Sequence, residues 1–361
     1  MRRFIPAVLL LFLFVGGMGW QLGKAKRPPP VSLTVSIPIV VTPTPTAPSL
    51  DPVSLESVFR SDHTKARALP EEKTVTLVAT GDVIPARSVN YKMATGHGFL
   101  WPWEKTADIL RSADLTVINL ETPLLSSCPV TVEGMLFCGD AKAVEGLVYA
   151  GVDVATLGNN HIGNHFEAGV EETKQHLLAA GITPVATGIA YKAVKGIRFA
   201  FLSYNDIGAP EAGVPWADEE RIQSDIGEAR NNADVVIVSY HWGVEYVTQP
   251  NDRQRRLAHL SVDAGADVVL GNHPHWIQPI EIYKEKFIMY AHGNFVFDQE
   301  WSEETKRGVV GRYVFYDKKL VDVEYLPVRI VDYGQPYFLE GQEKQTILDS
   351  LRTASMELHS K

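Results

Sequence analysis

The chain of 361 residues contains only two cysteines, which excludes a disulfide-rich scaffold and a cysteine-rich zinc module. It also lacks an excess of positive charge, because 34 lysines and arginines stand against 43 aspartates and glutamates, a formal net charge of −9. A generic nucleic-acid-binding protein needs a basic surface, so this balance argues against nucleic acid as a partner. A hydrophobic content of 45% excludes wholesale disorder and is typical of a folded globular protein.

Long apolar runs are also absent, except for one at the N-terminus from Phe4 to Trp20, directly after Arg2 and Arg3. In a helix this run spans roughly 25 Å, the short end for crossing a bilayer. It is longer than the apolar h-region of most secretory signal peptides, which is about 7–15 residues, and neither a clear Ala-x-Ala cleavage site nor a cysteine for lipid attachment follows it. We therefore predict that residues 1–27 are an uncleaved signal anchor, a single membrane-spanning segment. A cleaved signal peptide is the alternative, and a buried core helix is disfavoured.

A proline-rich segment follows the apolar run. Eight prolines interleaved with threonine and serine fall between residues 28 and 54, and repeated proline favours extended polyproline geometry over helix and sheet. We predict that residues 28–72 form a stiff linker that holds one domain, residues 73–361, away from the membrane. Residues 1–27 contain five basic and no acidic residues, so the remainder of the chain carries 29 − 43 = −14.

The two cysteines, Cys128 and Cys138, lie ten positions apart with Gly134 between them. In an oxidising compartment this spacing suits a disulfide that closes a short loop, and two unpaired buried thiols are the alternative. Positive residues flank both ends of the N-terminal apolar run, so they do not fix its orientation. The cysteines favour the outside, and we predict a single-pass protein of the cell membrane with an extracellular main domain.

From residue 73 onward, short β-branched runs alternate with longer helical patterns, which predicts an α/β architecture. Strands are expected at 74–80, 115–120, 152–157, 183–187, 197–203, 234–240 and 267–270. Helices are expected at 103–112, 141–150, 166–180, 219–231, 252–264 and 341–357. After residue 276 the strands follow one another closely, at 278–283, 286–290, 295–297, 308–316 and 320–330, which predicts antiparallel sheet.

Polar residues stand just beyond the apolar strands, at the strand ends where α/β proteins place their chemistry. Asp82 follows the first strand on a glycine turn that is expected to expose it. Asn119 and Glu121 are two positions apart on an extended chain, so their side chains point the same way. The other strand ends carry further polar residues: Asn160 and His161, His241 and Glu245, His273 and His275, and His292 and Asn294.

The combination is more informative than any single member, because an isolated aspartate or histidine in such a place is often only a helix cap or a core residue. Five of the eleven histidines lie just beyond apolar strands. A mixture of carboxylate, amide and imidazole ligands suits Zn, Mn or Fe(II). The sequence therefore predicts a site for one or two divalent metal ions, which can bind a phosphate or activate a water.

Read in order, these motifs resemble the CapA family of bacterial capsule-synthesis proteins. The sharpest are HWGVEY at 241–246, GNHPH at 271–275 and GNFVFDQ at 293–299, and the resemblance covers about residues 73–330. It implies a four-layer αββα sandwich of the calcineurin-like metallophosphatase superfamily, with the site at the sheet edges. It also implies a membrane-tethered outer domain that serves poly-γ-glutamate synthesis and export, with membrane-embedded capsule synthesis proteins as expected partners.

The resemblance assigns roles residue by residue. It implies metal ligands at Asp82, Glu121, Asn160, His241, His273 and His275. His161 corresponds to a histidine that protonates a leaving group, and Arg87 matches a family arginine able to bind a phosphate or carboxylate; a structural ion pair is the alternative for Arg87. We assign substrate binding to Asn119, Arg87, Glu245, His292 and Asn294.

Three departures from the pattern weaken the case for catalysis. The superfamily has Asp-x-His at its first motif, but Val83 and Ile84 follow Asp82, so one metal site lacks a ligand unless a neighbour such as His292 substitutes. His292 itself stands where the family usually has leucine. Asn164 stands where the family has aspartate, which removes a carboxylate near the metal.

Three hypotheses about function remain open. The first is a surface-anchored protein acting in the synthesis, export or attachment of poly-γ-glutamate or a similar anionic polymer. The second is a metal-dependent hydrolase of phosphate esters or polymer linkages. The third is a non-catalytic scaffold that binds a polyanion. An intracellular nucleotidase is a fourth reading, which fails if the domain lies outside the cell.

Overall fold

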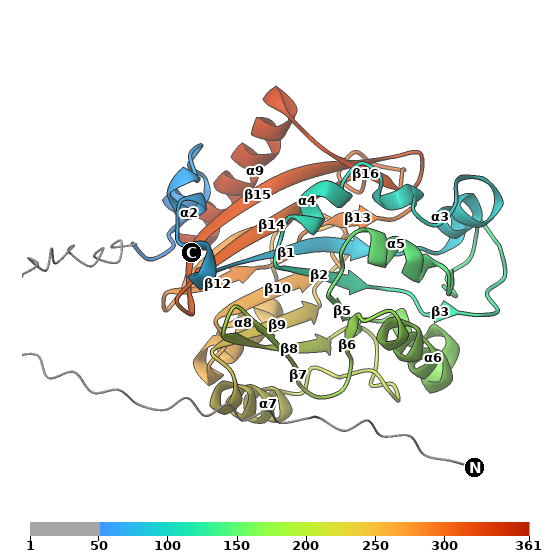
Figure 1. Cartoon of the computed structure of the whole chain (residues 1–361), viewed down its shortest axis with the longest axis horizontal. Helices are drawn as coiled ribbons and strands as arrows, with labels where there is room; N and C mark the ends of the chain where they lie inside the picture. The colour runs from blue at the N-terminus through green and yellow to red at the C-terminus, as the bar shows by residue number, and fades with distance from the viewer. Residues whose placement is uncertain (1–50, 361) are drawn as a thin grey trace, which may run out of the picture. The chain divides into compact units, whose positions relative to one another are not determined.

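The computed structural model describes residues 51–360, and these form a mixed α/β fold (Figure 1). The predicted anchor at 1–27 and residues 28–50 of the predicted linker lie outside the described residues. Among residues 51–360, no helix is both long and apolar enough to span a bilayer.

Two large β-sheets face each other. The first has the order β16-β15-β14-β1-β2-β5-β6, with β13 pairing β1, and the second has the order β11-β12-β10-β9-β8-β7. The strands of the first sheet are β1 Thr74–Val83, β2 Leu115–Leu120, β5 Val154–Thr156, β6 Thr183–Val185, β13 Asn294–Val296, β14 Arg307–Tyr316, β15 Lys319–Val331 and β16 Gln335–Phe338. Those of the second are β7 Ala190–Val194, β8 Ile197–Asn205, β9 Val235–His241, β10 Val268–Asn272, β11 Ile280–Tyr283 and β12 Lys286–Met289. A separate pair joins β3 Leu124–Leu125 to β4 Gly139–Asp140.

An apolar core fills the space between the sheets, and helices cover both outer faces. Leu77 and Val117 of the first sheet pack in one buried cluster with Phe201 and Ile237 of the second. The outer face of the first sheet is covered by α3 Arg87–Lys92, α4 Ala107–Arg111, α5 Ala143–Tyr149 and α6 Phe166–Ala179. The outer face of the second is covered by α7 Glu219–Asn232 and α8 Asp252–Ala264.

The strands and helices follow from local sequence. Strand β9, VVIVSYH, is a β-branched apolar run and every residue in it is buried, as expected for a central strand with both faces covered. Helix α8 begins at Asn251, which forms a capping box with Gln254, and ends before Gly265 at φ 122°. Short turns of helix complete the chain: η1 Glu71–Lys73, η2 Met93–His97, η3 Trp101–Trp103 and η4 Ile162–His165.

The C-terminal part differs in one respect from the sequence prediction. Strand β15 pairs in antiparallel fashion with both β14 and β16, and β11 is antiparallel to β12. However, β12 joins β10 in parallel and β13 joins β1 in parallel. The short spacing between these strands predicted antiparallel sheet. Strand β12 has an antiparallel neighbour and a parallel one, and β13 pairs in parallel with β1, an early strand of the chain.

The predicted linker extends too far, because its last part belongs to the domain. Helices α1 Leu55–Val58 and α2 Thr64–Arg67 pack on the fold, and Val58 is buried in the core between the sheets. His63 Nδ1 lies 2.9 Å from a carboxylate oxygen of Asp322 on β15, and Arg60 pairs with the same carboxylate. Helix α9 Gly341–His359 packs beside this segment and against β11 and β15.

Candidate metal centre

The predicted site residues gather where the parallel strands of both sheets end. In the first sheet Asp82 of β1 pairs in register with Asn119 of β2, and Glu121 is the first residue after the end of β2. In the second sheet Asn272 of β10 pairs with His241 of β9. The glycine before Asp82 predicted an exposed turn, but β1 continues to Val83 and buries the Asp82 carboxylate completely.

Glu121 is the central residue of this edge. Its side chain has no solvent exposure, and neither carboxylate oxygen accepts a hydrogen bond within the described part of the chain. Oε1 lies 3.2 Å from His241 Nε2, without hydrogen-bond geometry. Burial, together with the nearby charge of Asp82, raises the pKa of Glu121 well above its usual range. A buried carboxylate without donors is costly to maintain unless a cation offsets its charge.

Glu121 belongs to two clusters whose ligand atoms lie within 4.8 Å of one another. One consists of Glu121, His241 and His273, and the other of Asp82, Glu121 and His275; all five residues are buried. Asn160 follows β5 at the same edge, and its Oδ1 is buried with no hydrogen-bond partner. A carboxylate shared by two groups of nitrogen and oxygen donors fits a pair of divalent cations.

Two asparagines hold these candidate ligands in place. Asn119 Nδ2 donates to Asp82 Oδ1 at 2.8 Å and lies 3.3 Å from His241 Nδ1, while Asn119 Oδ1 accepts from Asn159 Nδ2 at 3.2 Å. All of the side-chain hydrogen-bonding groups of Asn119 therefore face protein groups. Its predicted role in substrate binding is not supported by this geometry, and it orients ligands instead.

Asn294 has a similar role beside His275. Asn294 Nδ2 donates to the Thr305 carbonyl at 2.9 Å, so its Oδ1 accepts from His275 Nδ1–H at 2.9 Å. Asn294 is completely buried, so it supports His275 rather than contacting substrate as predicted. Although burial opposes its charged form, the hydrogen bond to Asp82 and the charges of Glu121 and Asp82 raise the pKa of His275 to about 9.

His292 is not at the site. Its Nδ1 donates to the Gly271 carbonyl at 3.1 Å, and its Nε2 lies 3.2 Å from the Tyr313 hydroxyl. Both ring nitrogens are thus occupied inside the core, and burial lowers the pKa of His292 to about 4. The prediction that His292 binds substrate or replaces a missing ligand is therefore wrong, because the ring points between the sheets.

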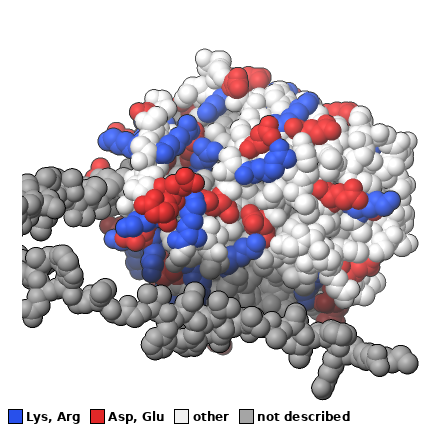
Figure 2. All heavy atoms as spheres, in the orientation of Figure 1, with Lys and Arg blue, Asp and Glu red and all other residues white. Residues whose placement is uncertain are grey.

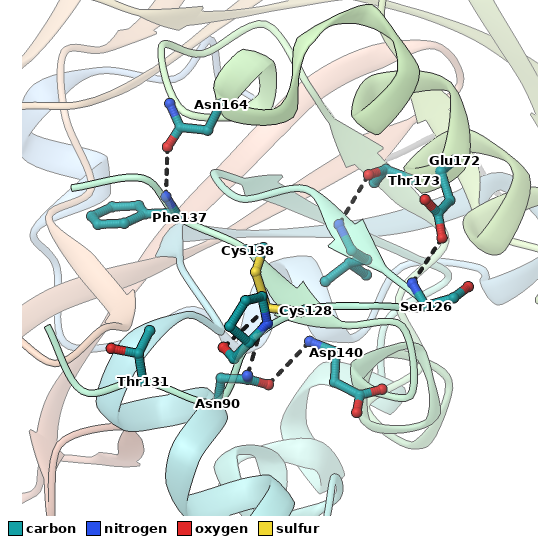
Figure 3. Close-up of a disulfide and its surroundings, with 12 residues drawn as sticks. Asn90, Ser126, Cys128, Thr131, Phe137, Cys138, Asp140, Asn164, Glu172 and Thr173 are labelled. Carbon is teal, nitrogen blue, oxygen red and sulfur yellow. Dashed lines mark hydrogen bonds between the residues drawn. A yellow bond between two sulfur atoms is a disulfide. The ribbon is translucent and has the colours of Figure 1, made fainter. Parts of the chain in front are cut away.

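His161 lies beside the loop that the two cysteines close, in contact with Phe137 and Asn164. Figure 3 shows this disulfide with Phe137 and Asn164 near it. The structure links Cys128 to Cys138, and the Phe137 ring stacks on the His161 ring with centroids 4.0 Å apart. Asn164 Oδ1 accepts from the Phe137 amide at 2.7 Å, so it also accepts from His161 Nδ1–H at 3.0 Å. Burial lowers the pKa of His161 to about 4, so at neutral pH its Nε2 carries a lone pair.

Arg87 lies on the other side of Phe137. Its guanidinium stacks over the rings of Phe137 and Phe297 at 4.8 and 5.1 Å and pairs with Asp298. Asp298 also accepts from the Ser88 amide at 3.0 Å. The structure therefore contains the ion pair that was the alternative interpretation of Arg87. If Arg87 also binds an anion, it must do so with the N–H groups that Asp298 does not occupy.

Glu245 lies on the solvent side of the centre. It is exposed, yet its carboxylate forms a third cluster with His273 and His275. The loop that carries it is fixed by the Tyr246 amide, which donates to the Pro274 carbonyl at 2.8 Å. Tyr246, His273 and His275 all have positive φ values, so this corner of the backbone is strained.

Several residues at the candidate metal centre were not predicted from the sequence. Asn159 and Asn272 lie at this edge, and Asn272 Oδ1 is buried without a partner among residues 51–360. Both follow a glycine at a strand end, as Asn294 does, so the repeated Gly-Asn pair was a usable signal. Phe137 and Asp298 left no such signal, because their roles depend on contacts between distant segments.

The sequence matches the profile of one protein family, described as bacterial capsule synthesis protein PGA_cap, over residues 76–299. The chain is 29% identical over 289 residues to the capsule biosynthesis protein CapA of Bacillus anthracis, covering 74% of this chain and 70% of that protein. It is 32% identical over 248 residues to the PGA biosynthesis protein CapA of Bacillus subtilis (strain 168), covering 64% of this chain and 65% of that protein.

Among solved structures, a phosphatase from Mycoplasma pneumoniae aligns with 73% of this chain and 95% of its own, at 13% identity and a TM-score of 0.46. At that score the likeness carries no argument about activity. The family match extends over more than half of the chain and includes every candidate ligand described above. The chain therefore belongs to the bacterial capsule synthesis protein family PGA_cap.

Proposed function

We propose that this chain acts in the synthesis, export or attachment of poly-γ-glutamate or a related anionic polymer, through a divalent metal centre. Relatives named for capsule and PGA biosynthesis support the biological role. The buried carboxylate of Glu121 supports the metal, because it has no hydrogen-bond donor and is shared by two clusters. The domain then corresponds to a four-layer αββα sandwich of the metallophosphatase type.

The donors present fit two ions. Asp82, Glu121 and His275 would hold one, and Glu121, Asn160, His241 and His273 would hold the other. These mixed nitrogen and oxygen donors suit Zn, Mn or Fe. A pair of such ions, when bound, supplies positive charge to an anionic substrate and activates water.

The test is metal content of the purified full-length chain by elemental mass spectrometry. Wild type is expected to bind one or two ions, and His273→Ala/His275→Ala to lose them. The matched control is His97→Ala/His176→Ala, which removes two histidines that lie outside the clusters and is expected to keep the metal. Failure of wild type to bind Zn, Mn or Fe after reconstitution would refute the metal centre.

A metal-dependent hydrolase of phosphate esters or polymer linkages is the second candidate, and His161 is the observation that favours it. Its Nε2 forms no hydrogen bond within residues 51–360, while its Nδ1–H donates to Asn164 Oδ1. Because the pKa of His161 is lowered to about 4, this nitrogen accepts a proton at neutral pH more readily than it donates one. This favours a role as a general base over the predicted role as an acid. Loss of turnover in His161→Ala with metal retained would support the hydrolase.

Binding of poly-γ-glutamate without turnover would instead support a non-catalytic scaffold. The residues around the centre offer few cations, since Arg87 is already paired with Asp298. Figure 2 shows lysines and arginines interspersed with acidic residues on the face drawn, with no continuous basic surface there. Contact with a polyanion would therefore have to be local or bridged by metal ions.

We also propose that residues 1–27 anchor the protein in the cell membrane with the main domain outside, near membrane-embedded capsule synthesis proteins. The Cys128–Cys138 disulfide supports an oxidising location. Protease treatment of intact cells tests this topology. The domain is expected to be digested from outside, and full protection would refute the proposed orientation.

A further inference from the structure

Glu245 is the only exposed member of the ligand clusters at the described sheet edge, and neither of the two proposed ion sites includes it. In the assignment proposed above, the site of Asp82, Glu121 and His275 has three protein donors, whereas the other site would gain a fourth from Asn160. The position two residues after Asp82 is Ile84, which is buried against Phe137 and Phe297 and offers no ligand atom.

We propose that Glu245 is a further metal ligand, which completes the ion site at His275 from the solvent side. This inference rests on the proposed metal centre. Its first support is position, because the Glu245 carboxylate lies within 4.8 Å of ring nitrogens of both His273 and His275. These two histidines belong to different ion sites, so the carboxylate faces the opening between them.

The second support is the way the chain presents this side chain. Trp242 is completely buried, and its Nε1 donates to the Tyr290 carbonyl at 2.8 Å, which fixes the start of the loop. Tyr246 fixes the end, through its amide to Pro274 and through its hydroxyl, which accepts from Gln299 Nε2 at 3.0 Å. Glu245 is therefore held over the histidines by anchors on both sides and does not reach them from a free loop.

The third support is that no cation of the described chain pairs with Glu245. The ion pairs formed by residues 51–360 do not include it, although many exposed acidic residues of the domain are paired. A carboxylate that lies close to two imidazoles and has no ion-pair partner among residues 51–360 is an arrangement that a hard or borderline cation completes.

The consequence is a centre with one replaceable ligand. The other candidate ligands are buried or have a buried donor atom, so they remain in place when an anionic substrate approaches. Glu245 alone is open to solvent, and an anion entering from that side meets it first. The carboxylates of the polymer and of Glu245 would then compete for the same coordination position.

The test compares metal stoichiometry and affinity in the full-length protein, by elemental mass spectrometry and by titration with Mn²⁺ or Zn²⁺. Loss of a residue that hydrogen-bonds to a metal ligand typically weakens metal binding roughly 10- to 100-fold. Glu245→Gln and Glu245→Ala are expected to weaken the binding of one ion by at least that much. Glu245→Asp, which keeps the carboxylate, is expected to recover part of the loss. The electron paramagnetic resonance spectrum of bound Mn²⁺ should change in the same variants.

The matched control is Glu211→Gln, which removes an exposed glutamate beside Gly163, close to His161 but in none of the clusters. Wild-type binding in both Glu245→Gln and Glu245→Ala would overturn the inference while leaving the metal centre intact. An equal loss in Glu211→Gln would overturn it too, because the effect would then be one of general charge. If wild type binds no ion, both this inference and the proposed function fall.

Discussion

Removal of the disulfide tests how the rim of the metal centre is held. The bond joins Cys128 to Cys138 across a sequence separation of 10. In the chain-entropy treatment, closing a loop of about ten residues lowers the entropy of the unfolded chain enough to contribute about 2.7 kcal/mol at 25 °C. Cys128→Ser/Cys138→Ser is therefore expected to lower the free energy of unfolding by that amount, and the melting temperature by about 5 °C.

The assay is urea unfolding of wild type and the double variant, each with and without reductant. Reductant should bring wild type to the level of the variant and leave the variant unchanged. The loop also carries Phe137 against His161, so the variant should expose His161 more to solvent. If the double variant loses less than about 1 kcal/mol in free energy of unfolding, the reasoning is refuted. The disulfide would then not stabilise the protein by lowering the conformational entropy of the unfolded chain.

Three further predictions concern the centre and its frame. Asn164→Asp places a charge 3.0 Å from His161 Nδ1 and should raise the pKa of His161 from about 4 by about 1–3 units, measured by NMR titration of metal-free protein; an unmoved pKa would contradict the contact. Metal affinity should rise with pH up to about 9, because His275 must release its proton to bind, and calorimetry showing no pH dependence would argue against this ligand. Gly81→Ala places a Cβ 2.1 Å from a backbone oxygen and should cost about 3 kcal/mol in thermal unfolding, whereas Gly227→Ala, with open space in α7, should be neutral or stabilising; similar effects of the two would count against the close packing.

Sequence reasoning located most of the candidate ligands because their signal is local. A polar residue that directly follows a β-branched run marks the end of a strand, and parallel strands end at one edge. Asp82, Glu121, His241, His273 and His275 were all found in this way, and the structure brings them together. The alternation of strands and helices likewise predicted the mixed α/β fold.

What failed depends on contacts that no local pattern encodes. His292 follows an apolar strand as the ligands do, but its ring turns inward to Tyr313 on a strand 21 positions later. The proline-rich composition assigned residues 51–72 to a linker, although His63 pairs with Asp322, 259 positions away. Asn119 and Asn294 were recognised as polar residues at the site, but their hydrogen bonds determine that they serve the ligands and not the substrate.

The docking of residues 51–73 has a mechanical consequence. Asp322, which pairs with Arg60 and His63, lies opposite Val314, and Val314 pairs with Thr76 near the beginning of β1. Asp82 lies six residues further along β1 than Thr76, which corresponds to about 20 Å. Helix α2 and the rim elements α3 and β3 accordingly lie at opposite ends of the sheets (Figure 1). A force applied at residue 51 would first act on the contacts of Arg60 and His63 with Asp322 on β15. The hydrogen-bonded strands would then distribute it before it reached the candidate metal ligands. The docked segment at residues 51–73 and the candidate metal ligands therefore lie far apart along the sheets, so a force applied through residue 51 would act away from those ligands.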